Sequence, residues 1–443
     1  MFRRHLLAVG LIASLLLAAV SGPAHAQAPA QPPSPAQAIT LIDAVTRALQ
    51  QNLQLQVAAY EVTIARQVLE QARAGKSGQA SLVTSYTRTN EKSTTIIVSG
   101  TTVTIPTPPE SYVARISMQY PLYTGGRLEA QIALAEASLR GAEATLERTR
   151  QTIVLATRQA YYQLLLARAQ EGTTQRLLAQ AEGNLSAALA RVQAGTAPRF
   201  DALQADVSVA AARQQVVRSQ TAVALARQSL AALLNLPLDA SLEPQETLRV
   251  VPVRADLQSL LDQALRARPE LVELQARVAA AAAARDVAAS GGRPTVAVAA
   301  GPDLIGASAG SLSFGWSVNL ALTLNVFDGG ITAARVKETE ARLEQLRASE
   351  AQLRQSIALE VRQGWLSLRA AEAELEASTR GVEQAQEALR LANVRYGAGV
   401  TTNLEVLSQQ SALSQAESNH TLALFNYNLA VAQIERATGT PAR

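Results

Sequence analysis

The chain lacks the residues on which most enzyme and metal sites are built. It has no cysteine among its 443 residues and three histidines, of which His5 and His25 lie within the first 26 residues. Without thiols there is no disulfide framework and no cysteine to carry a lipid. His420 alone cannot form a zinc cluster or a repeated Ser–His arrangement, and no glycine-rich phosphate loop is present. We therefore expect no catalysis, no metal and no cofactor.

The chain also lacks a basic block of the kind that binds nucleic acid. Its net charge is +4, and arginines alternate with Glu and Gln along stretches of helical pattern. This arrangement is typical of solvated helix faces. No nucleic-acid partner is expected.

Beyond the first 26 residues there is no long apolar run. A transmembrane helix needs roughly 18 or more such residues in succession. If the mature chain enters a membrane, it must therefore do so as strands of a closed barrel, because only that structure pairs every strand edge in lipid.

The start of the chain has the pattern of a secretory signal peptide. A positive group at residues 3–5 precedes an apolar stretch at residues 6–20, and a small-x-small cleavage site ends at Ala26. We expect cleavage near Ala26. The alternative is a retained membrane anchor, for which an apolar stretch of about 15 residues is short. The residues that follow, 27–40, are rich in proline and are expected to form a flexible lead-in.

Proline is absent from two long stretches, residues 122–197 and 303–440, although the chain has 17 prolines. From Leu128 to Ala160, apolar and small residues recur at steps of four and three, the heptad spacing of a coiled-coil seam. A helix through this stretch to residue 194 would be on the order of 100 Å long. A glycine-containing turn follows each long helix and predicts antiparallel helix pairs. The four helices are expected at 126–194, 199–235, 330–396 and 402–438.

The chain repeats itself. Residues 120–126 (YPLYTGG) correspond to 324–330 (LNVFDGG), and residues 191–195 (RVQAG) correspond to 395–399 (RYGAG), both at an offset of 204. A shared offset indicates two copies of one long unit. We divide the chain into a first repeat, a linker, a second repeat and a tail, at residues 41–235, 236–255, 256–438 and 439–443.

Each repeat begins with a helical pattern, from Leu41 to about Ala74 in the first and from Leu257 in the second. These two segments align at an offset of 216 instead of 204, so the first repeat carries additional residues before its Gly-Gly pair. We place them in residues 93–110, where three prolines predict an exposed loop.

Between the first helix and the Gly-Gly pair of each repeat, the apolar period changes to two. Every second residue from Leu312 to Val326 is apolar, and the first repeat alternates in the same phase. Alternation of this kind predicts strands. We expect one β-hairpin per repeat, at about 80–123 and 294–327.

The second face of these strands favours one of two interpretations. A soluble sandwich also alternates between apolar and polar residues. Small polar residues on the second face fit a water-filled lumen, and Tyr112, Tyr120 and Trp316 fit the aromatic belts of a membrane interface. We therefore favour a membrane β-barrel.

Two hairpins supply four strands, which are too few to close a membrane barrel, since the smallest common ones have about eight. Two chains would supply eight strands, and the interior of an eight-stranded barrel is filled by side chains. Three chains would supply about twelve strands, which leave room for a channel. The small lumen-side residues favour the second case. We therefore predict a mainly α fold with a membrane β-barrel part. In it, three chains close one membrane barrel of twelve strands, and the duplicated unit gives this trimer pseudo-sixfold symmetry.

At this point the chain resembles the TolC-like outer-membrane efflux protein family, over residues 41–439. The motifs are Tyr-Pro-Leu-Tyr-x-Gly-Gly at 120–126 and Arg-Tyr-x-x-Gly-x-x-Thr-x-x-Glu-Val-Leu at 395–407. The resemblance implies a homotrimeric channel, in which a twelve-stranded outer-membrane β-barrel continues as a periplasmic α-helical barrel. It also implies passive export of drugs, metal ions or proteins, delivered by an inner-membrane pump through a periplasmic adaptor protein.

Two acidic residues are candidates for a pore constriction. Asp201 and Glu405 each lie six residues after a turn glycine, at the repeat offset. In a trimer they would form a ring of carboxylates able to favour cations. The alternative is that they only offset the helix dipole.

The resemblance adds Tyr396 to this constriction, because Tyr and Arg bridges close the entrance in the family. Here Thr401 stands at the bridging Arg position and Ser408 at the second acidic position. Arg395 and Arg199 are the candidates to substitute for the missing arginine.

Glycines mark two further candidate sites. The turns at the helical tips match the family's contact with the adaptor, although any turn needs glycine; they contain Gly195, Thr196, Gly399 and Val400. The Gly-Gly pairs are expected to permit the swivel from strand to helix; they are Gly125, Gly126, Gly329 and Gly330.

The alternative function is a secreted trimeric coiled-coil adhesin or scaffold without a pore. It shares the signal peptide and the heptads with the channel. It does not predict paired hairpins or tight turns that reverse the helices.

Overall fold

The computed structural model describes residues 37–90, 93–98, 101–106, 109–250, 256–308 and 310–440. The predicted signal peptide and most of the lead-in lie outside these residues. The elements, in chain order, are β1 (Gln37–Ile39), α1 (Leu41–Gln51), α2 (Leu53–Ala74), β2 (Gln79–Arg88), β3 (Ser93–Val98), β4 (Thr101–Pro106), β5 (Glu110–Tyr123), α3 (Arg127–Gln193), α4 (Arg199–Leu233), β6 (Leu242–Pro244), α5 (Leu257–Ala267), α6 (Pro269–Ala289), η1 (Ser290–Gly292), β7 (Thr295–Gly306), β8 (Ser313–Thr323), α7 (Ile331–Gly397) and α8 (Asn403–Ala437).

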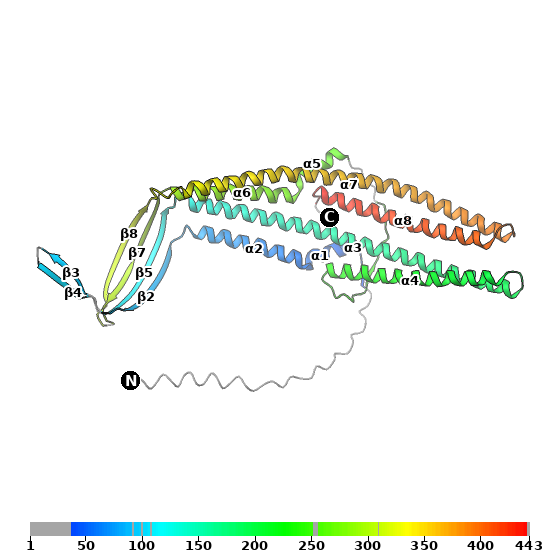
Figure 1. Ribbon diagram of the computed structural model, residues 1–443, viewed down its shortest axis with the longest axis horizontal. Coiled ribbons are helices and arrows are strands. Elements are labelled where there is room, and N and C mark those ends of the chain that lie inside the picture. Colours follow the sequence, from blue (N-terminus) through cyan, green and yellow to red (C-terminus); the bar gives the residue numbers. More distant parts are fainter. Residues whose placement is uncertain are drawn as a thin grey trace, which may run out of the picture.

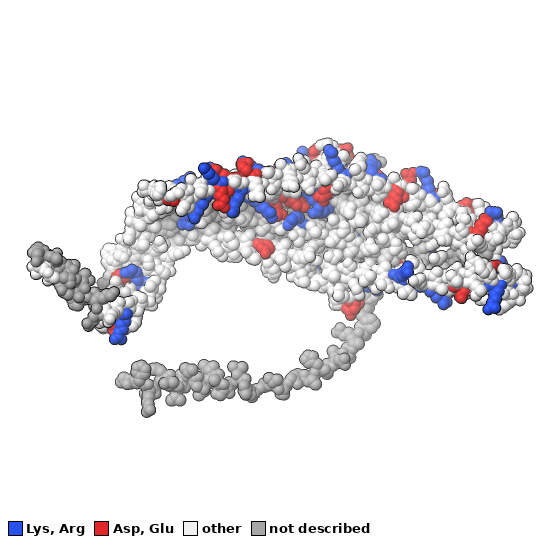
Figure 2. Space-filling view, in the orientation of Figure 1, with Lys and Arg blue, Asp and Glu red and all other residues white. Residues whose placement is uncertain are grey.

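The molecule is mainly helical and elongated, with a sheet at one end and two helical turns at the other (Figure 1). The helices α3 and α7 run through the whole helical body. In its sheet-proximal half α3 packs against α2 and α6, and in its distal half against α4 and α8. The helix α7 packs against α6 and then α8. Acidic and basic side chains alternate along the visible face of this body (Figure 2).

The core of the body is thin and built largely from small residues. Its largest cluster surrounds Tyr161, Leu164 and Leu230, which are fully buried in the middle of the molecule. Many of the other buried positions are alanines, for example Ala135 and Ala205. Because alanine adds little width, the long helices can approach each other closely over their whole length.

The main sheet has four antiparallel strands in the order β2-β5-β7-β8. Each hairpin of the chain supplies two of them, and the pairing of β5 with β7 joins the hairpins. The strands β2 and β8 therefore form the two edges. Within the described residues neither edge has a second partner.

The loop expected at residues 93–110 is wrong in part, because the structure places a two-stranded hairpin, β3–β4, within it. Both strands are rich in threonine, isoleucine and valine, whose branched side chains favour extended backbone. The prolines lie only at and beyond the end of β4, so they bound the hairpin and do not prevent it.

The single helix expected from Leu41 to Ala74 is also broken, at Asn52. The side chain of Asn52 accepts a hydrogen bond from the Gln54 amide at 2.9 Å and donates one to the Leu233 carbonyl at 3.0 Å. A matching break occurs at Arg268, which has extended backbone because Pro269 follows it.

Two segments expected to be irregular contain short strands. Residues 37–39 of the expected lead-in form β1, which pairs in parallel with β6 of the linker. The Tyr161 hydroxyl donates to the Ile39 carbonyl at 3.1 Å and fastens this pair to α3.

Within the described residues, none of the helices combines the length and the apolarity needed to cross a membrane.

Candidate functional site

The turn between α3 and α4 and the turn between α7 and α8 have the same backbone geometry. Gly195 and Gly399 have φ of +70° and +73°. The residue after each glycine donates its amide to the carbonyl five positions back, Thr196 to Arg191 at 2.9 Å and Val400 to Arg395 at 3.0 Å. This is the Schellman pattern that ends a helix. No atom lies within 4 Å of a side chain built at either glycine, so only the backbone angle requires glycine.

Glu405 is held at the second of these tips. It accepts a hydrogen bond from the Arg395 guanidinium at 2.8 Å and another from the Thr401 hydroxyl. Arg395, a candidate substitute for the missing bridging arginine, is thus in contact with the acid. In the described part of the chain, Arg199 has no ion pair within 4.0 Å.

Asp201, the residue equivalent to Glu405, has a different environment. It lies in the first turn of α4, where its charge offsets the helix dipole. Among the described residues, no ion pair within 4.0 Å involves it. The two tips therefore share their turns but not their electrostatic contacts.

A contact between the two halves of the chain joins the tips. The guanidinium carbon of Arg191, on α3, lies 4.6 Å from the centroid of the Tyr396 ring, on α7. Arg191 and Arg395 are equivalent at the repeat offset, yet one lies over a ring of the other half and the second pairs with Glu405. Tyr396 was among the residues expected from the sequence, but Arg191 was not. The contact joins two different helices, and no pattern along the chain indicates which residue of one helix will lie against the ring on the other.

The Gly-Gly pairs lie at the start of α3 and α7, where the strands turn into helices. Gly125 and Gly126 have φ of +66° and +87°, and Gly329 and Gly330 have +65° and +87°. Residues with side chains rarely adopt such angles. Gly125 is also short of space, because a side chain there would begin 2.9 Å from Cβ of Arg293.

The sheet carries large apolar side chains on one face. On β8 these are Phe314, Trp316, Val318, Leu320 and Leu322, which are 62–74% exposed. The pairing register places apolar residues of the other strands, such as Leu82, Met118 and Tyr120, on the same face. Tyr112 packs there against Tyr86, with ring centroids 4.9 Å apart. Most of the sheet surface visible in Figure 2 is uncharged.

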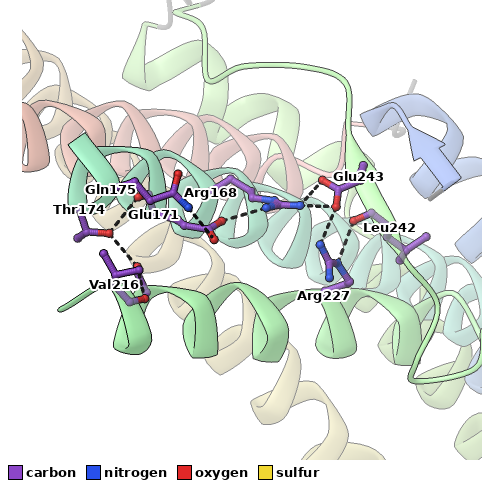
Figure 3. Close-up of polar contacts among 9 residues, drawn as sticks. Arg168, Glu171, Thr174, Gln175, Val216, Arg227, Leu242 and Glu243 are labelled. Atoms are coloured by element: carbon purple, nitrogen blue, oxygen red, sulfur yellow. Dashed lines mark hydrogen bonds and ion pairs between the residues drawn. The ribbon is translucent and has the colours of Figure 1, made fainter. Parts of the chain in front are cut away.

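A polar network fastens the linker to the middle of the helical body. In Figure 3, Arg168 from α3 and Arg227 from α4 both point toward Glu243 of β6. Arg227 also donates to the Leu242 carbonyl at 3.1 Å, and Arg168 to Glu171 at 2.9 Å. A cavity of about 440 Å³ lies beside this network. This network could not be predicted from the sequence, because its members are far apart along the chain.

Within the part of the chain that the structure describes, there is no group of three or more metal-ligating side chains.

Comparisons with known proteins agree with this architecture. The model of the outer membrane efflux protein family matches residues 44–236 and 260–440. Protein CyaE of Bordetella pertussis is 28% identical over 319 residues, which are 70% of this chain and 67% of CyaE. The pyoverdine export outer membrane protein OpmQ of Pseudomonas aeruginosa is 27% identical over 70% of this chain and 65% of OpmQ. The matched region therefore spans about two thirds of these relatives.

Other relatives match over nearly the full chain. The cobalt-zinc-cadmium resistance protein CzcC of Cupriavidus metallidurans is 24% identical over 98% of both chains. Among solved structures, the outer-membrane channel OprN aligns with a TM-score of 0.78 at 22% identity, over 90% of this chain and 89% of OprN. The outer membrane protein VceC of Vibrio cholerae aligns with a TM-score of 0.76 at 21% identity, over 90% and 96%.

The name of OpmQ refers to pyoverdine export, that of CzcC to cobalt-zinc-cadmium resistance, and OprN is an outer-membrane channel. The adhesin alternative finds no support among these proteins. The match of the family model to both halves of the chain confirms the resemblance inferred from the motifs. The chain belongs to the outer membrane efflux protein family.

Proposed function

We propose that three copies of this chain form a passive exit duct through the outer membrane. The observation that carries the proposal is the pair of open edges on the four-stranded sheet, β2 and β8. Because all neighbouring strands are antiparallel, β2 and β8 run in opposite directions, so β8 of one copy can pair with β2 of the next. In lipid the open edges must be paired. Three copies supply twelve strands, enough for a lumen.

The apolar face of the sheet supports this placement. Side chains such as Trp316 and Leu320, at 74% and 67% exposure, would be costly in water and favourable against lipid tails. Tyr112, Tyr120 and Trp316 would then lie at the lipid boundary. The opposite face, with Ser317, Asn319 and other small polar residues, would line the lumen.

The helical body has apolar stripes where neighbouring copies would meet. On α2 five residues three or four apart are 44–69% exposed: Leu53, Val57, Tyr60, Ile64 and Val68. The order of contacts, α2 to α3 to α6 to α7, leaves α2 and α7 at opposite edges of the body. On α7, Leu359 and Leu366 are 57% and 60% exposed. Contact between α7 of one copy and α2 of the next would bury both stripes.

We interpret the two halves as a duplicated unit, which gives the trimer pseudo-sixfold symmetry. The helices α3 and α7 each have 67 residues, and α4 and α8 each have 35. The four glycines at the strand–helix junctions adopt matching angles in pairs. Each half would supply one hairpin to the barrel and two helical arms to the tube.

The helical tips would form the periplasmic entrance. Glu405, Tyr396 and Asp201 would line its narrowest part, with Arg395, Thr401 and Arg191 holding the closed arrangement within each chain. The exposed turns at Gly195, Thr196, Gly399 and Val400 would contact the periplasmic adaptor of an inner-membrane pump. The signal peptide would direct the chain across the inner membrane, with cleavage near Ala26.

The test uses two neighbouring residues of β8 whose side chains leave opposite faces of the sheet. Leu320→Lys should reduce membrane insertion, because a lysine on the lipid face costs about 2–4 kcal/mol near the bilayer midplane. Asn319→Lys should insert normally and alter only the conductance of the purified protein in planar bilayers. Wild-type protein that stays monomeric in mild detergent, or that opens no ion path, would refute the duct. Equal insertion of both variants would refute the assignment of the faces.

A further inference from the structure

The face of the sheet assigned to the lumen carries one acidic and one basic side chain per chain. Among the residues of β2, β5, β7 and β8, all within the described part, these are Arg115 and Asp303. They are direct partners in the β5–β7 register, so both side chains leave the same face. The other charged residues of these strands, Arg88 and Glu110, share their face with Tyr86 and Tyr112.

The strands are shaped to accept Asp303. Its partner on β8 is Gly315, where a side chain would begin 2.5 Å from Oδ1 of Asp303. Any residue larger than glycine would therefore displace the carboxylate. At Gly301, two residues earlier on β7, a side chain would collide with the Ile116 carbonyl at 1.8 Å. The carboxylate thus lies in a niche left by Gly315, while Gly301 only lets the β5 backbone approach β7 closely.

The two charges differ in how far they reach from the wall. The Asp303 side chain is 19% exposed and the Arg115 side chain is 53% exposed. Nη2 of Arg115 lies 3.4 Å from Oδ2 of Asp303, a long contact that occupies one of the five N–H donors of the guanidinium. Among the described residues, no other side-chain hydrogen bond of Arg115 occurs.

The Arg115–Asp303 pair is poorly suited to stabilise the sheet. Exposed ion pairs contribute little to stability, and the backbone ladder already joins β5 to β7 over most of their length. The niche holds the acid in place, while the arginine projects from the sheet. This arrangement is better suited to position the guanidinium for a second carboxylate, one that belongs to a solute.

We propose that Arg115 is an anion-binding station on the lumen wall, which binds carboxylate groups of solutes that pass through the duct. This inference rests on the proposed trimeric channel, in which three copies of Arg115 would form a ring. Arg115 lies five residues from the start of β5, about 17 Å along the strand from the end that follows β4. The station would therefore lie in the half of the barrel far from the helices.

Citrate, a small tricarboxylate, is the probe. Added on the barrel side of a planar bilayer, it should block the open wild-type channel in a concentration-dependent way. Arg115→Gln should weaken the block about tenfold, because the charge-assisted hydrogen bonds are lost. Arg115→Lys should retain part of it. Asp303→Asn should strengthen it several-fold, because the amide oxygen can still accept from the guanidinium while the negative charge that competes with citrate is removed. Arg88→Gln, on the other face, is the matched control and should behave as wild type.

An Arg115→Gln channel that conducts and is blocked as well as wild type would overturn the anion-binding station and leave the duct intact. Absence of conductance in every variant would refute the duct itself. In that case, equilibrium binding of citrate to the purified oligomer becomes the readout. Binding that is equal in wild type and Arg115→Gln would then overturn the station.

Discussion

Loss of Arg268 should open one part of the helical body without disturbing the rest. This residue lies between α5 and α6, is 3% exposed, and donates to both oxygens of Glu270 at 3.1 and 3.2 Å. It also pairs with Glu360 on α7, and Arg436 on α8 joins the same two acids. Four helices therefore meet at one network of two arginines and two glutamates.

The substitution Arg268→Met keeps the aliphatic volume and removes the charge. It leaves two partly buried carboxylates to share Arg436, and loss of one partner from a buried pair costs about 3–5 kcal/mol. Because Arg436 still compensates, we expect the lower end, about 3 kcal/mol, or about a hundredfold more frequent local opening. The control is Arg342→Met, which breaks a pair with side chains 69% and 57% exposed. It should change opening by less than about 0.5 kcal/mol.

Native-state hydrogen exchange, read by mass spectrometry, measures this opening segment by segment. Exchange in Arg268→Met should accelerate in α5, the start of α6 and the end of α8, where Gly439 packs against Ala267. The helical tips should exchange as in wild type. Unchanged protection of α5, or an equal effect of Arg342→Met, would refute the reasoning.

The same network fixes the sign of one pH dependence. Burial would raise the pKa of Glu270, but hydrogen bonds from Arg268 and its own backbone and the charges of Arg268 and Arg436 lower it below its ordinary 4.5. The unfolded segment therefore binds the proton more readily than the native one. The contribution of Glu270 is complete above about pH 4.5 and is lost as the pH falls through the lowered native pKa. Glu270→Gln should make α5 less protected at neutral pH and less sensitive to acid.

Two further predictions concern the junctions and the tips. Gly126→Ala, at φ of +87°, should destabilise the assembly by about 1–2 kcal/mol, measured by thermal unfolding. Gly183→Ala, inside α3 with nothing near its added carbon, should stabilise the assembly by about 0.5–1 kcal/mol. A more stable Gly126→Ala than Gly183→Ala protein would contradict the claim that the strand-to-helix swivel requires glycine. Glu405→Gln removes the negative charge that pairs with Arg395 and should raise resting single-channel conductance. Asp201→Asn, which breaks no ion pair, should raise this conductance less. Equal effects of the two substitutions would contradict the proposal that the contacts of Glu405 hold the entrance closed.

The long helices could be predicted because their signal is local and repeated. Heptad spacing and the absence of proline place a helix at residues 126–194, and α3 spans Arg127–Gln193. The alternation of apolar residues likewise places strands where β5 and β8 occur. These patterns depend only on which face of an element is apolar.

The breaks and the added hairpin were harder to predict because two local signals competed. Asn52 caps α2 and Pro269 is the first residue of α6, yet the apolar period continues through both positions. In residues 93–110 the prolines indicated a loop, whereas the branched side chains of β3 and β4 form strands.

The contacts at the site could be predicted only where both partners lie near one turn. Arg395 and Glu405 are ten residues apart on either side of a predicted turn, so their pairing follows from the turn. Arg191 and Tyr396 lie on helices from different halves, and Arg115 and Asp303 on strands from different hairpins. Only the packing of the halves brings those residues together.

The central claim is that three copies close one barrel through the edges β2 and β8. Electron cryomicroscopy of the mature protein in lipid nanodiscs tests it most directly. We predict threefold symmetry, with β8 of each chain paired to β2 of the next and Trp316 facing lipid. A monomer, another symmetry, or a particle in which β2 and β8 stay unpaired would contradict the account.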